Sequence, residues 1–101
     1  MRNIGFTILA TILALLFQIA ASCAADPERL AIACMSCHGA DGIGRGSIPP
    51  LAGRSAAELD EAMKAFASGT RKGTVMNFLA KGYNADQIAE LAAYFSTRKT
   101  P

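Results

Sequence analysis

The sequence lacks the features that mark a nucleic-acid-binding surface. Charged residues make up only 18% of the 101 residues, with ten basic and eight acidic side chains. Tryptophan is absent, and no basic stripe alternates with aromatic side chains, so the sequence gives no support for a nucleic-acid partner. The charges are also too evenly balanced to indicate any other class of partner.

Patterns typical of β-strands are missing as well, and three stretches have the signals of helices instead. We therefore expect an all-α fold of three main helices joined by loops. Residues 39–53 and 70–77 are expected to be loops, since the first is rich in glycine and proline and the second has no clear period. The first helix is expected to begin at Asp26-Pro27. The second is expected to open with a capping box at Ser55–Glu58 and to stop at Ser68-Gly69, and the third to open with a second capping box at Asn84–Gln87.

The first 25 residues have the composition of a secretory signal peptide. A short, weakly basic start precedes an apolar run over residues 4–21, and small residues follow. A transmembrane helix is the alternative, because the run approaches the roughly 18 to 20 apolar residues that a membrane span needs. The small residues favour export to the periplasm, with cleavage after Ala24 or Ala25. One domain, residues 26–101, is expected to remain.

Cys23 lies within this leader and has two interpretations. A lipid attached to its sulfur would anchor the protein to a membrane. Bacterial lipoprotein sites usually carry leucine three positions before the cysteine, and Ala20 occupies that position here. We expect Cys23 to leave with the signal peptide, so that membrane attachment would arise only if Cys23 is lipidated.

The expected domain is small enough to need a covalent or metal-based support for its core. It retains two cysteines, Cys34 and Cys37, and a single histidine, His38. A structural zinc site would need four ligands. A thioredoxin-like redox pair would belong beside a βαβ pattern, which the sequence does not have.

Cys34, Cys37 and His38 instead form the pattern C-x-x-C-H, which is the attachment site of a c-type haem. On a helix, residues three and four positions apart lie on the same face. Both thiols can therefore form thioethers with one porphyrin, and His38 can bring its imidazole to the iron. A single covalently attached haem c would also supply the apolar surface that so small a core lacks.

A sixth iron ligand must come from a residue other than histidine, and methionine is the best candidate. Histidine–methionine ligation is typical of electron-transfer cytochromes and raises the reduction potential. Met35 is inside the attachment motif and cannot reach the opposite face of the haem, and Met63 lies on the apolar stripe of the middle helix. Met76 is expected in a loop with enough chain to reach around the ring, so we expect it to be the ligand. The alternative is that Met76 is a packed loop residue and that the iron has five ligands or a different sixth ligand.

Pro49 is a candidate for a supporting role at the haem histidine. A ligating histidine normally donates its second ring N–H to a fixed acceptor. A rigid proline segment shortly after the motif can present a carbonyl for that purpose. The prolines could equally serve only to shape the loop, and the residues alone leave both interpretations open.

With these motifs, the chain resembles the class I cytochromes c. Cys34–Gly39 resembles the family's haem site, and Pro49–Gly53 is similar to its P-x-L-x-G segment, whose proline carbonyl bonds the haem histidine. The resemblance implies that Met76 is the axial methionine and that residues 88–94 belong to the final helix, which crosses the N-terminal helix. It also implies a monohaem domain over residues 26–101 that carries single electrons.

A narrower likeness indicates a partner. Residues 63–71, 74–76 and especially Ala80-Lys81-Gly82-Tyr83 are similar to the cytochrome subunit of sulfide dehydrogenase, also called flavocytochrome c. The resemblance implies a flavoprotein subunit that oxidises sulfide and passes electrons to the haem. Other periplasmic redox proteins are the alternative, with this chain as a freestanding shuttle to an oxidase or reductase. An open-site haem sensor or a peroxidase-like protein is a third possibility. With both axial positions filled, we expect an electron-transfer protein and not an enzyme acting alone.

Overall fold

The structure is a computed structural model that describes residues 3–21 and 26–100. Over these residues the chain is helical, which confirms the expected all-α class, and its one pair of bridged residues is Arg45 with Ile48. The elements are α1 (Ile4–Ala21), α2 (Pro27–His38), the 3₁₀ turn η1 (Ala40–Gly42), α3 (Ala56–Ser68), α4 (Met76–Leu79), the 3₁₀ turn η2 (Ala80–Gly82) and α5 (Ala85–Ser96).

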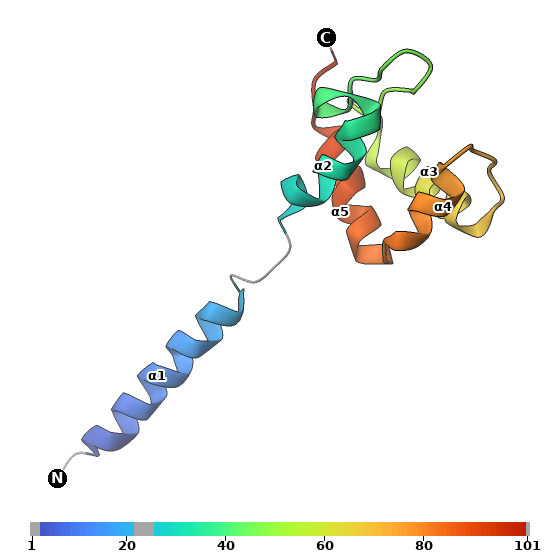
Figure 1. Ribbon diagram of the computed structural model, residues 1–101. Coiled ribbons are helices and arrows are strands. Elements are labelled where there is room, and N and C mark those ends of the chain that lie inside the picture. The colour runs from blue at the N-terminus through green and yellow to red at the C-terminus, as the bar shows by residue number, and fades with distance from the viewer. Residues whose placement is uncertain (1–2, 22–25, 101) are drawn as a thin grey trace.

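Helix α1 lies apart from the other helices (Figure 1). Its apolar side chains from Ile4 to Leu15 are exposed, Leu13 for example to 66%. Among the residues described in full, none of the helices is both long enough and apolar enough to cross a bilayer. The expected cleavage after Ala24 or Ala25 and the fate of Cys23 concern residues outside the described ones.

The three expected helices form where their capping residues predict. Asp26 caps α2, since its Oδ1 accepts a hydrogen bond from the Glu28 N–H at 3.1 Å, and proline follows at the first helical position. Asn84 and Gln87 form a complete capping box at α5: each side chain accepts from the other residue's backbone N–H, at 2.8 and 2.9 Å.

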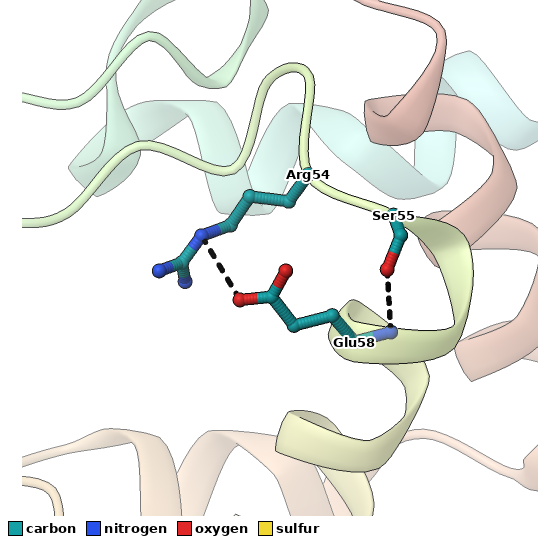
Figure 2. Close-up of polar contacts among 3 residues, drawn as sticks. All are labelled: Arg54, Ser55 and Glu58. Carbon is teal, nitrogen blue, oxygen red and sulfur yellow. Dashed lines mark hydrogen bonds and ion pairs between the residues drawn. The ribbon is translucent and has the colours of Figure 1, made fainter.

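The capping box expected at α3 is only half formed. Ser55 Oγ accepts from the Glu58 N–H at 3.1 Å, as a cap should. The Glu58 carboxylate does not return this bond but lies 3.6 Å from Arg54 Nε (Figure 2). Figure 2 shows the Arg54 side chain extending from the preceding loop toward the carboxylate, with which it forms an exposed ion pair.

Helix α5 organises the core because it packs against both α2 and α3 (Figure 1). It supplies three of the five residues of the central cluster, while α2 and α3 supply one each. Within the described residues no large side chain is less than 2% exposed, so the protein part of the core is thin, as the length predicts. The buried cluster consists of Ala31, Leu59, Leu91, Ala92 and Phe95.

The segment expected to be a loop over residues 70–77 ends earlier than predicted. Helix α4 begins at Met76, so Met76 and Asn77 are helical. The turn closes because the N–H groups of Phe78 and Leu79 both donate to the Val75 carbonyl at 3.0 Å. A helix of four residues is too short to show a periodic pattern, and for this reason the sequence did not predict it.

Candidate haem site

The C-terminal half of α2 presents both thiols and the single imidazole on consecutive turns. Cys34 is half-buried and packs against the central cluster, whereas Cys37 is exposed, and both thiols are free. His38, the last residue of the helix, is only 9% exposed. Burial raises the pKa of the Cys34 thiol, because a thiolate is poorly stabilised away from water. Cys34 is therefore held in its neutral form more firmly than an exposed thiol would be.

The imidazole of His38 is fixed by the backbone of the proline loop. Its Nδ1 lies 2.7 Å from the Pro49 carbonyl oxygen. A carbonyl can only accept, so this contact places the imidazole proton on Nδ1 and leaves the lone pair on Nε2. That is the tautomer in which Nε2 can bind a metal ion, with its orientation set by an acceptor of the kind that ligating histidines use.

The loop returns Pro49 to His38 through a tight turn at Gly44. The Gly44 N–H donates to the His38 carbonyl at 2.6 Å, and the backbone there has φ +90°. A Cβ at Gly44 would lie 3.0 Å from Pro50 N and 3.2 Å from the Ile48 carbonyl oxygen. Only glycine adopts this φ without strain and leaves that room. The geometry at His38 therefore depends on a glycine six residues farther along the chain.

The three methionines of residues 26–100 occupy different surroundings. Met35 is half-buried and packs against the central cluster from α2, so its side chain is used in the core. Met63 is half-buried in the middle of α3. Met76 is half-buried as the first residue of α4, in an element separate from the one that carries His38. The structure thus brings His38 and Pro49 into direct contact and places Met76 on another part of the fold.

Asn77, the residue after Met76, makes three side-chain hydrogen bonds that sequence reasoning missed. Its Oδ1 accepts from the Gly73 N–H at 2.8 Å. Its Nδ2 donates to the carbonyls of Phe66 at 2.9 Å and Arg71 at 2.7 Å. The only available signal was a short polar residue in an apolar stretch, since asparagine often bonds nearby backbone groups.

Tyr83 directly follows η2 in the chain and is half-buried. It packs against the central cluster, which Cys34 also contacts. Burial raises the pKa of the Tyr83 hydroxyl, and a negative charge on Cys34 would raise it further. The pair indicates that the end of the Ala80–Tyr83 segment lies close to the attachment motif on α2.

Apolar side chains around Met76 are left uncovered by protein. Phe78 is 82% exposed, Val75 57% and Leu79 44%. So small a domain rarely exposes large apolar side chains together without a ligand or partner to cover them. With two free thiols and an imidazole whose Nε2 is available, these residues fit a haem in donor chemistry and in apolar contact surface.

Comparison with known proteins agrees with this chemistry. The family described as cytochrome c oxidase, cbb3-type, subunit III, matches residues 22–95. Cytochrome c-554(548) from Halomonas halodenitrificans is 41% identical over 70 residues, which are 65% of this chain and 84% of that protein. The cytochrome subunit of sulfide dehydrogenase from Chlorobaculum tepidum is 40% identical over 68 residues, 67% of this chain and 62% of the subunit.

A solved structure with the same arrangement belongs to a larger protein. The structure of thiosulfate dehydrogenase from Marichromatium purpuratum matches with a TM-score of 0.63 and 40% identity, over 65% of this chain and 15% of that one. Three further relatives are also much longer, since this chain spans 28%, 34% and 42% of their lengths. The shared region is the cytochrome domain, and this chain therefore belongs to the class I cytochromes c, whose members carry covalently bound haem c.

Proposed function

We propose that this cytochrome is an exported monohaem electron carrier with His38 and Met76 as its axial ligands. Cys34 and Cys37 form the thioethers, and the Pro49 carbonyl holds His38 in orientation. The observation that carries the proposal is the 2.7 Å contact between His38 Nδ1 and the Pro49 oxygen. It fixes the imidazole tautomer that ligation requires, directly after Cys37 and about one helical turn from Cys34.

Met76 is the axial methionine that the surroundings support best. Met35 contacts the central cluster from α2 and lies between the two attachment cysteines, so it cannot approach the far face of the haem. Met63 is in the interior of α3, the helix whose Leu59 belongs to the core. Met76 instead stands where α4 begins, among the exposed apolar side chains of Val75, Phe78 and Leu79.

The protein contributes orientation and access, and the bound haem supplies one-electron chemistry between its ferric and ferrous states. Pro49 fixes the ring of His38, and Cys34 is half-buried against the central cluster. Val75 and Phe78, which are exposed in the protein alone, would exclude water from the apolar surface of a bound haem. If His38 and Met76 both held the iron, no position would remain for a substrate, which would fit a carrier and not an enzyme acting alone.

An absorption experiment separates a carrier from an open-site haem protein. The ferric protein is expected to show the band of methionine–iron ligation near the red edge of the spectrum, and to lose it in Met76→Ala but not in Met63→Leu. The ferrous protein is expected to bind CO slowly or not at all. A ferric protein without the band, together with rapid CO binding by the ferrous form, would establish an open site and remove Met76 from the ligand set.

A flavoprotein sulfide dehydrogenase is the electron donor that we propose. The support is the 40% identity to a cytochrome subunit of sulfide dehydrogenase and the Ala80–Tyr83 segment. Two relatives named thiosulfate dehydrogenase electron acceptor, each 40% identical, favour thiosulfate dehydrogenase as the second candidate.

A stopped-flow assay of haem reduction distinguishes the two candidate donors. Rapid reduction by the flavoprotein with sulfide, and not by thiosulfate dehydrogenase with thiosulfate, is expected; the opposite pattern would exchange the two donors, and reduction by neither would favour a freestanding shuttle.

Export through a cleaved signal over residues 1–25 completes the proposal. The apolar, exposed side chains of α1 and its position apart from the core support a segment that is not part of the folded domain. Intact-mass measurement of the haem protein from a periplasmic fraction is expected to give the mass of residues 25–101 or 26–101 plus one haem. A mass that retains residues 4–21, or one with a lipid on Cys23, would contradict it.

A further inference from the structure

We propose that Asn77 is a positioning residue that holds the segment 70–75 closed against α3 and thereby keeps Met76 on the iron. The inference rests on the proposed ligation by Met76. Asn77 follows Met76 directly in α4, so any movement of its side-chain anchors is transmitted to the ligand through one peptide unit.

One amide group joins three separate parts of the backbone. The Asn77 Nδ2 donates to the Phe66 carbonyl in the last turns of α3 and to the Arg71 carbonyl in the following segment, at 2.9 and 2.7 Å. Its Oδ1 accepts from the Gly73 N–H at 2.8 Å. The side chain uses both donor hydrogens and one acceptor position, so no other residue type of similar size can make the same three bonds.

Most of this segment has little else to hold it. Its first two residues are held to α3 by other contacts. The Arg71 N–H donates to the Ala65 carbonyl at 3.1 Å, and the Arg71 guanidinium lies 4.8 Å from the centre of the Phe66 ring. Thr70 Oγ1 donates to the Ala65 carbonyl at 3.3 Å and lies 3.1 Å from Ser68 Oγ. Residues 70–75 are all exposed. Beyond Arg71, the described contacts of the segment with α3 are the bonds through Asn77 and the packing of Gly73, where a Cβ would lie 2.9 Å from the Phe66 ring and 3.4 Å from Met76 Cβ. Gly73 therefore links the segment, α3 and Met76 in one place.

The central cluster does not depend on this arrangement. Its residues belong to α2, α3 and α5, and none belongs to residues 70–79. If the three Asn77 bonds are lost, the segment can open and release the methionine while the helices stay packed, because local opening needs far less free energy than global unfolding. This separation between ligand release and unfolding is what distinguishes a positioning role from a merely structural one.

The experiment follows two signals in the haem-loaded protein during heating. The red-edge band reports the methionine–iron bond, and far-UV circular dichroism reports the helices. In the wild type the two midpoints are expected to lie close together. In Asn77→Ala the band is expected to disappear several degrees below the loss of helix. Asn77→Asp is expected to behave in the same way, since it keeps the acceptor for Gly73 but loses both donations.

Asn84→Ala is the matched control. Asn84 is also an asparagine with a bonded side chain, but it caps α5 and has no bond to the segment 70–75. Both of its midpoints are expected to fall together. If Asn77→Ala and Asn77→Asp also lose the band and the helices together, Asn77 is only structural and the inference is wrong. If the wild type lacks the band altogether, ligation by Met76 fails and the inference falls with it, which separates the two failures.

Discussion

Gly42 lies against the aromatic ring at the centre of the core, and replacing it with alanine should destabilise the fold by two separable effects. Its backbone has φ +74°, in the region that side chains disfavour. A Cβ there would lie 2.7 and 2.8 Å from two carbons of the Phe95 ring. Phe95 is 2% exposed and belongs to the central cluster, so its ring has little room to withdraw.

The expected loss is the sum of a backbone cost and an overpacking cost. A left-handed conformation costs a residue with a Cβ about 1–2 kcal/mol, and forcing an extra carbon into a packed core costs about 1–3 kcal/mol. Gly42→Ala should therefore lower the free energy of unfolding by about 2–5 kcal/mol. Gly46→Ala isolates the first cost, since Gly46 has φ +56° and a Cβ there would meet nothing within 4 Å. It should lose only about 1–2 kcal/mol.

Denaturant unfolding of the haem-loaded variants, followed by far-UV circular dichroism, measures both values. Adding Phe95→Leu to Gly42→Ala should recover part of the overpacking cost, because a smaller side chain leaves room for the new methyl group. The reasoning would be refuted if Gly42→Ala and Gly46→Ala lost equal stability. It would also be refuted if the effects of Gly42→Ala and Phe95→Leu were simply additive.

Three further predictions concern local chemistry. In Tyr94→Phe, Tyr83 is the remaining tyrosine, and its ¹³Cζ resonance should titrate above the ordinary pKa of about 10. Because the pKa of Tyr83 is raised in the folded state, its contribution to stability should be intact below about pH 10 and should be lost as the pH rises further. Ser55→Ala should cost about 1 kcal/mol in a denaturant titration, whereas Glu58→Ala should cost less than that, because its carboxylate completes no cap and its ion pair is exposed. Cys37→Ala should retain haem through one thioether, so the pyridine haemochrome spectrum of the denatured variant should shift toward that of a haem with one free vinyl group. An unshifted spectrum would show that Cys37 is not an attachment point.

The helices could be predicted because their boundaries depend on neighbouring residues. Asp26, Asn84 and Gln87 bond backbone groups within three positions, and the pattern of these residues is sufficient to locate α2 and α5. Glu58 could not be predicted in the same way. Its carboxylate has two possible partners within four residues, and only the conformation of the preceding loop decides that it lies near Arg54.

The site was partly predictable for the same reason. The C-x-x-C-H motif is local, and its place at the end of α2 follows from helical spacing. The acceptor for His38 is eleven residues away, so the choice between a bonded carbonyl and a loop-shaping proline needed the turn at Gly44 to be known. Asn77 was missed because its partners lie up to eleven residues back in α3 and the segment that follows it.

The proposal that Met76 is the iron ligand opposite His38 can be tested by methionine-methyl NMR of the ferrous protein. A methyl group on the iron lies over the porphyrin and is shifted far upfield by the ring current. Protein labelled with ¹³C at methionine methyl groups should show one such resonance, which should be absent in Met76→Leu and retained in Met35→Leu and Met63→Leu. A spectrum without an upfield methyl, or one whose upfield methyl disappears in Met63→Leu, would contradict the claim.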